Sequence, residues 1–288
     1  MNDTIEIQNS GQEQKAAKII GLGLLLSTVF FTALHHGFPG VLHVPSNEGV
    51  PYSGYFAMFL LDLIPIGFAW LCFYHARQKL GLYRAMIFLS GSFLFTGLEE
   101  SMWILFGRFQ ILNKIMTFFG KPLEAVAGTY YFTRGFFWWL ETPLVAFLGW
   151  FFIAYSCVYA ANLLMPKANI ITKAAFGGLL GVNLDLWLDP VHVHKAWQSW
   201  IWLANDPVNI FSIPFSNFIG WFLVIALFAI LFEYLPGMVK KWGLAKGTAY
   251  FYLILVALEF CILMIVVIYG AIGMKIFPEP VNLTLWGL

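Results

Sequence analysis

Charge is scarce in this sequence. Only 11% of the 288 residues are charged and 60% are hydrophobic, whereas a soluble domain carries about 25% charged and about 45–50% apolar residues. The 16 basic and 15 acidic residues nearly cancel, so no net field attracts a polyanion. This composition excludes an ordinary soluble enzyme, a disordered chain and a basic protein that binds nucleic acid. It leaves an integral membrane protein.

Cysteine is also scarce. The three cysteines, Cys72, Cys157 and Cys261, lie in apolar runs and lack the spacing of metal ligands. They indicate neither a disulfide framework nor a zinc site. We expect them to be small buried hydrophobic side chains.

Long apolar segments, in contrast, are abundant. A membrane-spanning helix needs about 20 apolar residues, and seven segments meet this requirement. They are residues 17–36, 54–75, 84–107, 143–165, 170–189, 215–235 and 248–274. The predicted fold is therefore all-α, a polytopic transmembrane helix bundle of about seven spans within a range of six to eight. It forms a single domain, residues 17–288, after a polar tail, residues 1–16.

Basic residues give the expected orientation. With the N-terminus inside, ten Lys and Arg side chains fall on the inner side and six on the outer side, as the positive-inside rule favours. The connection at residues 109–142 is too long for a simple loop, and its amphipathic first part predicts an interfacial or re-entrant segment. The next span starts either at Pro143, with Thr142 as its N-cap, or near Arg134 with a proline kink inside it.

Polar groups in the predicted spans fall in one layer. Ionisable residues within a bilayer are costly and by default mark function. Five spans bring such groups or an amide to the outer half of the membrane, which is what a single cavity would require. They are Asp62, Glu99, Glu100, Glu141, Asp185, Asp189 and Asn217. For any one carboxyl group, the alternative is a helix–helix hydrogen bond or a side chain that extends to the interface.

The spacing of the acidic pairs gives more detail. Asp185 and Asp189 are four residues apart and so share a helix face, while Pro190 favours the end of that helix. Adjacent side chains on a helix diverge by about 100°, so only one of Glu99 and Glu100 is expected to point straight into a cavity. We favour Glu100, with Trp103 beside it.

Aromatic residues are numerous, with 30 Phe, 12 Tyr and 12 Trp. Trp138 and Trp139 lie beside Glu141, and Trp187 lies between the two aspartates. Ring faces beside acidic groups suit a polyene or a cationic intermediate. An aromatic belt at the membrane interface is an equal alternative.

Histidines raise the question of a metal. A site built from His35, His36, His192 and His194 with nearby carboxylates is conceivable. Membrane desaturases and hydroxylases use more histidines, in repeated motifs that this sequence lacks. We therefore expect interfacial polar residues here and predict no metal.

Several segments resemble one family. Those in the second half read Asn183-Leu-Asp-Leu-Trp-Leu-Asp189-Pro190-Val191, Trp197-x-x-Trp200 and Ile213-Pro214-Phe-Ser216-Asn217-Phe-Ile-Gly220-Trp221. Those upstream are Gly128-Thr-Tyr130-Tyr131-Phe132-Thr133 and Glu-Thr-Pro143-Leu followed by Phe147-Leu-Gly-Trp150-Phe. Together they resemble the integral-membrane carotenoid biosynthesis proteins that include the bisanhydrobacterioruberin and gamma-carotene hydratases.

The resemblance implies a hydro-lyase of the cell membrane. Such an enzyme adds water to the terminal double bond of an acyclic carotenoid end by acid catalysis through a tertiary carbocation. It takes its lipophilic polyene substrate from the bilayer and needs no cofactor. The alternatives are an isoprenoid or carotenoid cyclase, which uses the same protonation chemistry, and a metal-dependent lipid desaturase or hydroxylase.

The chemistry assigns roles to the candidate residues. An acid protonates the alkene, a carboxylate takes a proton from water, and ring faces stabilise the cation. The candidate catalytic residues are Glu100 or Glu141 as the acid, Asp185 or Asp189 as the base, and Asn217 as the orienting group. The candidate substrate-binding residues are Trp138, Trp139, Trp187, Tyr130, Tyr131 and Trp221.

Overall fold

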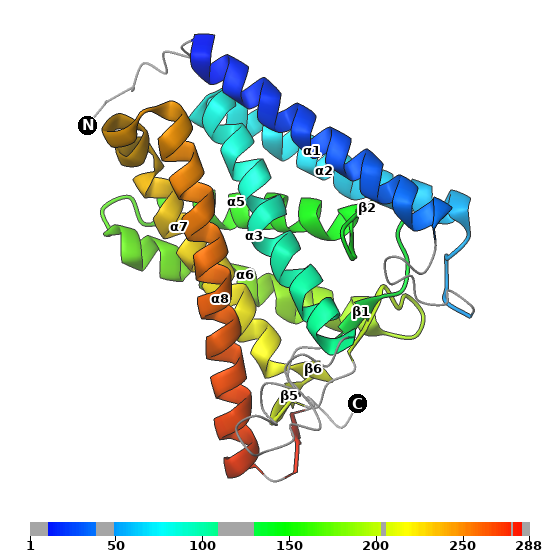
Figure 1. Cartoon of the computed structure of the whole chain (residues 1–288). Coiled ribbons are helices and arrows are strands. Elements are labelled where there is room, and N and C mark those ends of the chain that lie inside the picture. Colours follow the sequence, from blue (N-terminus) through cyan, green and yellow to red (C-terminus); the bar gives the residue numbers. More distant parts are fainter. Residues whose placement is uncertain (1–10, 39–48, 109–129, 203–205, 278, 284–288) are drawn as a thin grey trace.

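The computed structural model describes residues 11–38, 49–108, 130–202, 206–277 and 279–283. The described part contains seven helices (Figure 1). They are α1 (Gly11–Gly37), α2 (Tyr55–Leu80), α3 (Leu82–Arg108), α5 (Leu144–Leu164), α6 (Ile170–Val193), α7 (Phe215–Trp242) and α8 (Leu244–Ile276). Each coincides with one of the seven predicted apolar segments, so the predicted all-α helix bundle is confirmed.

Five of the described helices are long and apolar enough to cross a membrane, namely α1, α2, α5, α7 and α8. The other two, α3 and α6, carry the acidic pairs at residues 99–100 and at residues 185 and 189. Polar groups inside a bundle need neighbouring helices to cover them. The number of crossings and the side on which the chain begins stay predictions.

The helices form a ring with two outer members. Helices α5, α6, α7 and α8 each pack on the next, and α3 packs against both α5 and α8, which closes the ring. Helices α1 and α2 pack on the outside of α3, and α2 also contacts α5 (Figure 1). The acidic pair of α3 therefore belongs to the ring rather than to its outer layer.

Close contact between α6 and α7 depends on glycine. A Cβ on Gly178 would lie 2.8 Å from the backbone oxygen of Phe222, and one on Gly181 would lie 2.2 Å from Ile225. Small residues on one face of a helix let the backbones of two helices approach. The acidic face of α6 is thereby held against the first turns of α7.

Short strands, which the sequence did not predict, gather at one end of the bundle. They are β1 (Tyr130–Phe132) with β4 (Trp200–Trp202), β2 (Trp138–Trp139) with β3 (Thr142–Pro143), and β5 (Val208–Ile210) with β6 (Ile213–Pro214) and β7 (Val281–Leu283). Strands β1, β2 and β3 lie between α3 and α5, β4, β5 and β6 lie between α6 and α7, and β7 follows α8, so all lie at the same end of the ring. We call this the strand end.

Two local predictions about helix ends were wrong. Thr142 does not cap α5, which begins at Leu144 after Pro143, and the Thr142 hydroxyl instead hydrogen-bonds Ser101 at 3.1 Å. Pro190 does not end α6, which continues to Val193. Of the predicted interfacial segment, residues 130–142 contain strands, and residues 109–129 lie outside the described residues.

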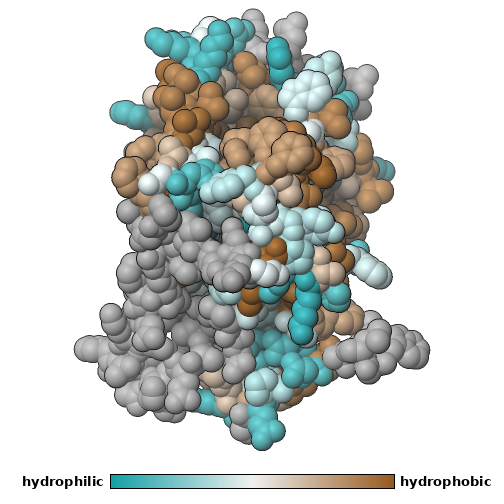
Figure 2. Space-filling view, turned by 90° about the vertical axis from the view of Figure 1, so that its right-hand side faces the viewer, coloured by the Kyte–Doolittle hydropathy of each residue, from teal (hydrophilic) through white to brown (hydrophobic). Residues whose placement is uncertain are grey.

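The exterior of the bundle is apolar over wide areas. Leu22, Phe30, Phe56, Trp70 and Leu253 are each more than half exposed. Figure 2 shows a broad hydrophobic area on one face, with hydrophilic side chains above and below it. Such a surface would be unstable in water and matches contact with lipid, so the protein is a membrane protein.

Candidate active site

Carboxyl groups of α6 meet the first turn of α7. The Asn217 Nδ2 donates to Oδ2 of Asp185 and to Oδ2 of Asp189, each at 2.7 Å. A side-chain amide has two N–H donors, and both are used here. Asp185 is 0% exposed and Asp189 is 4% exposed. The two aspartates therefore share a face of α6, as their spacing predicts, and one amide bridges them.

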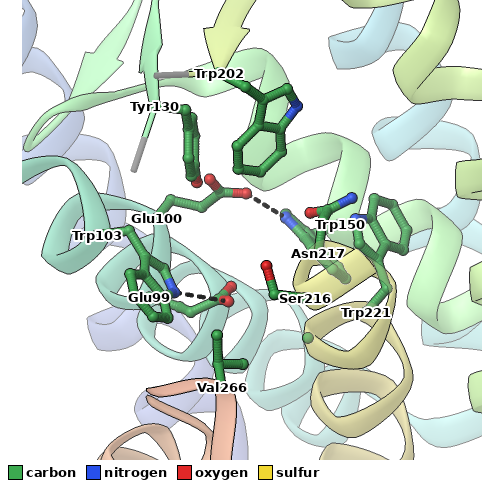
Figure 3. Close-up of a pocket in the computed structure, with 11 residues that line it drawn as sticks. Glu99, Glu100, Trp103, Tyr130, Trp150, Trp202, Ser216, Asn217, Trp221 and Val266 are labelled. Atoms are coloured by element: carbon green, nitrogen blue, oxygen red, sulfur yellow. Dashed lines mark hydrogen bonds between the residues drawn. The ribbon is translucent and has the colours of Figure 1, made fainter. Parts of the chain in front are cut away.

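Both glutamates of α3 reach the same place. The Trp150 Nε1 donates to Oε1 of Glu100 at 3.0 Å, and the Trp103 Nε1 donates to Oε1 of Glu99 at 3.3 Å. In Figure 3 both side chains extend from α3 toward the start of α7. The expectation that only one of them points there was wrong, because long glutamate side chains converge despite diverging at Cα. Trp103 also pairs with Glu99 rather than with Glu100.

A small cavity lies between the two glutamates of α3 and the first turns of α7 (Figure 3). Its volume is about 30 Å³, which is enough for a water molecule but not for an isoprenoid end. The described residues that line it are Glu99, Glu100, Trp103, Tyr130, Trp150, Trp202, Ser216, Asn217, Gly220, Trp221 and Val266. The Ser216 hydroxyl has no hydrogen-bond partner among the described residues, so it is available to a bound water.

Four carboxyl groups lie at or beside the cavity. Glu99 and Glu100 line it, and Asp185 and Asp189 share the amide of Asn217 in its wall. No lysine, arginine or histidine is among the described residues that line the cavity. Crowded carboxyl groups without a cation are costly to ionise together. An acid catalyst needs a carboxyl group in such surroundings.

Aromatic rings form the remaining walls. Trp150 stacks on Trp221 with ring centroids 3.9 Å apart, and Tyr130 lies against Trp202 at 4.6 Å. The first pair comes from α5 and α7, and the second comes from β1 and β4. Electron-rich ring faces stabilise a nearby positive charge. The cavity thus combines acidic groups, room for water and aromatic surfaces.

The structure gathers about half of the predicted site residues. It brings together Glu100, Asp185, Asp189, Asn217, Tyr130 and Trp221. It does not place Glu141, Trp138, Trp139, Trp187 or Tyr131 on the cavity wall. Trp138 stacks on His35, and Trp139 donates to the Ser27 hydroxyl at 3.0 Å. Trp187 is 74% exposed, on the outside of the bundle.

Asp62 and the histidines have structural partners. Oδ2 of Asp62 accepts hydrogen bonds from the backbone of Phe136 and of Phe137, each at 3.0 Å, and so holds the chain before β2. His192 stacks on Trp200 with ring centroids 4.4 Å apart. Among the described residues, no group of three or more His, Cys, Asp or Glu side chains is arranged to hold a metal ion.

Asp206 is a buried acidic residue that the sequence did not reveal. It is 0% exposed and accepts hydrogen bonds from the backbone of Val208 at 3.0 Å, the backbone of Ser216 at 3.1 Å and the Tyr269 hydroxyl at 2.9 Å. A carboxylate at a helix N-terminus satisfies its free N–H groups. Asp206 thereby fixes the start of α7, where Asn217 lies. Its position ten residues before Ser216 gives no capping signal.

The fold and the cavity define a helical membrane protein with a buried acidic site. The model of the carotenoid biosynthesis protein family matches residues 125–285, which is more than half of the chain. The chain belongs to this family, and its role lies in carotenoid biosynthesis. No curated protein and no solved structure matches it.

Proposed function

We propose that this protein is a carotenoid hydratase of the cytoplasmic membrane. It adds water to the terminal double bond of an acyclic carotenoid end and leaves a tertiary alcohol. The observation that carries the proposal is the cavity, in which Glu99, Glu100 and the amide of Asn217 surround space for a water molecule, while that amide also binds the two aspartates of α6. Membership of the carotenoid biosynthesis family supports the substrate class.

The first step is protonation of the alkene. Glu100 gives a proton to the less substituted carbon of the terminal double bond, so the π electrons form a C–H bond and the other carbon becomes a tertiary cation. A carboxylic acid in a poorly hydrated site can keep its proton at neutral pH and so act as the donor. The Trp150 N–H that binds Glu100 stabilises the carboxylate left behind.

The second step is capture of the cation by water. The water oxygen forms the C–O bond, and the oxonium proton passes to the Asp185–Asp189 pair. Asn217 fixes both aspartates through its two N–H groups, and the free Ser216 hydroxyl is placed to hold the water. The ring faces of Trp221 and Trp202 stabilise the positive charge of the cation until water adds.

Substrate reaches the site from the bilayer in this proposal. A long acyclic polyene dissolves in lipid, and the wide apolar exterior of the bundle permits lateral access. The cavity of about 30 Å³ holds the water alone, so the polyene end must displace part of the aromatic wall. The carboxyl groups are in place before substrate binds, and the aromatic wall opens as the polyene end enters, so a single binding event completes the site.

The test is pigment analysis in a bacterial strain that makes lycopene. The strain expresses the full chain, and a strain with the empty vector is the control. A pigment heavier by one water for each modified end is the expected result. A new pigment with the same mass as lycopene would indicate cyclisation instead of hydration, since cyclisation adds no atoms. Pigment identical to the control would contradict the proposal for acyclic carotenes.

A further inference from the structure

Gly220 lines the cavity, and the proposed reaction gives it no role. It lies in α7, four residues after Ser216, so the two residues share a helix face. A Cβ built on Gly220 would have one neighbour within 4 Å among the described residues outside α7, namely Oε1 of Glu99 at 3.5 Å. Glu99 lines the cavity as well. A side chain at position 220 would therefore extend into the cavity toward this carboxyl group.

The space that this glycine leaves open suits one water molecule. The cavity volume is about 30 Å³, and a buried water also needs at least two polar partners. The Ser216 hydroxyl, which has no partner among the described residues, and the carboxyl group of Glu99 point toward one another here (Figure 3). They supply these partners from two sides. A methyl group on residue 220 would compete with the water for the same place.

We propose that Gly220 selects hydration by reserving this place for the water that captures the cation. The inference rests on the proposed hydration. When the place is filled, the cation has no water with which to form a C–O bond. A C–H bond beside the cationic carbon then breaks, its electrons form a double bond, and the proton passes to the Asp185–Asp189 pair. The product keeps the mass of the substrate, so residue 220 decides between hydration and isomerisation.

Gly220→Ala fills this place with the smallest side chain. The distance of 3.5 Å from Glu99 is an ordinary van der Waals contact, and alanine favours a helix more than glycine does. The midpoint of thermal unfolding in detergent should therefore equal or exceed that of the wild type. Protonation of the alkene should persist. The hydrated product should fall by about a hundredfold, as expected when a reactant is displaced by about 1 Å.

Heavy water separates protonation from hydration in one experiment. The purified full chain is placed in vesicles that contain lycopene and are suspended in heavy water, and the extracted pigment is washed with ordinary water before mass analysis. Deuterium that the acid delivers to carbon stays in the pigment, whereas deuterium on oxygen is exchanged away. The wild type should add both carbon-bound deuterium and water. Gly220→Ala should add deuterium without water.

The matched control is Gly177→Ala. A Cβ on Gly177 also makes an ordinary contact, 3.6 Å from the backbone oxygen of Cys157, but Gly177 is not among the described residues that line the cavity. This variant should hydrate lycopene as the wild type does.

The outcomes for Gly220→Ala distinguish the inference from the proposed function. Hydration at the wild-type rate would overturn the role of Gly220 and leave the hydratase intact. Loss of both deuterium and water, or a lower unfolding midpoint, would overturn it as well, because Gly220 would then serve the acid or the fold. If the wild type itself adds no water, the proposed function fails.

Discussion

Trp150 stacks on Trp221 with ring centroids 3.9 Å apart and ties α5 to α7 beside the carboxyl groups of the cavity. The same indole of Trp150 donates to Glu100 at 3.0 Å. One side chain thus sets both the distance between two helices and the position of the proposed acid. Its two roles can be separated by substitution.

Trp150→Phe should keep the stacking and remove the N–H donor. We expect turnover to fall by about tenfold to a hundredfold, since one hydrogen bond to a charged group contributes about 1.5–3 kcal/mol. The measurement is the rate of hydrated pigment formation at equal protein level. Trp187→Phe is the control, because Trp187 is 74% exposed. A wild-type rate in Trp150→Phe would contradict a catalytic role of the hydrogen bond from Trp150 to Glu100.

Asp189→Asn should nearly abolish turnover without loss of the fold. The amide oxygen of the new side chain still accepts from Asn217, but the base that takes the water proton is weakened. Pigment mass measures the activity, and circular dichroism measures the helix content. Glu233→Gln removes an exposed carboxyl group and should change neither. Hydration at the wild-type rate in Asp189→Asn would exclude this residue as the base.

Gly178→Ala should destabilise the bundle. A Cβ at this position lies 2.8 Å from a backbone oxygen of α7, so the helices must separate, at a cost of about 1–3 kcal/mol. Gly149→Ala is the matched control, since nothing lies within 4 Å of a Cβ there, and a helix gains about 0.5–1 kcal/mol from this change. Thermal unfolding in detergent compares the two, and equal midpoints would contradict the close packing of α6 and α7.

Asp206→Ala should lower both stability and turnover. It leaves two backbone N–H groups and the Tyr269 hydroxyl without their acceptor, at about 1–3 kcal/mol for each group that stays buried and unpaired. Tyr269→Phe removes only one of the three bonds and should cost about 1 kcal/mol. Thermal unfolding measures both variants. An equal loss in the two would show that the hydroxyl, and not the start of α7, is what Asp206 stabilises.

The helices could be predicted from the sequence because each contains a largely apolar segment of about 20 residues. The strands could not, since they are two or three residues long and their pairing joins segments far apart in the chain, such as Tyr130 with Trp202. The i, i+4 spacing correctly predicted a shared face for Asp185 and Asp189. Pairing of Asn217 with both depends on the α6–α7 contact, which no local pattern contains.

Helix geometry explains one misplaced residue. Trp187 is two residues from each aspartate, so its side chain lies about 200° around the helix from theirs. It therefore faces away from the cavity, as its exposure shows. Asp206 was missed for another reason: its partners Ser216 and Tyr269 come together only when the ring of helices closes.

The walls of the cavity differ in how firmly they are held. Its glutamates are carried by α3 and the aspartates beside it by α6, both of which pack against two helices of the ring, whereas the rings of Tyr130 and Trp202 are carried by a ladder of three residues in each strand. Short paired strands have little independent stability. Thermal motion at the strand end would therefore move the wall of Tyr130 and Trp202 first and leave the acid and the base in register. The rate of substrate binding would then depend on β1 and β4, and the rate of the chemical step on α3 and α6.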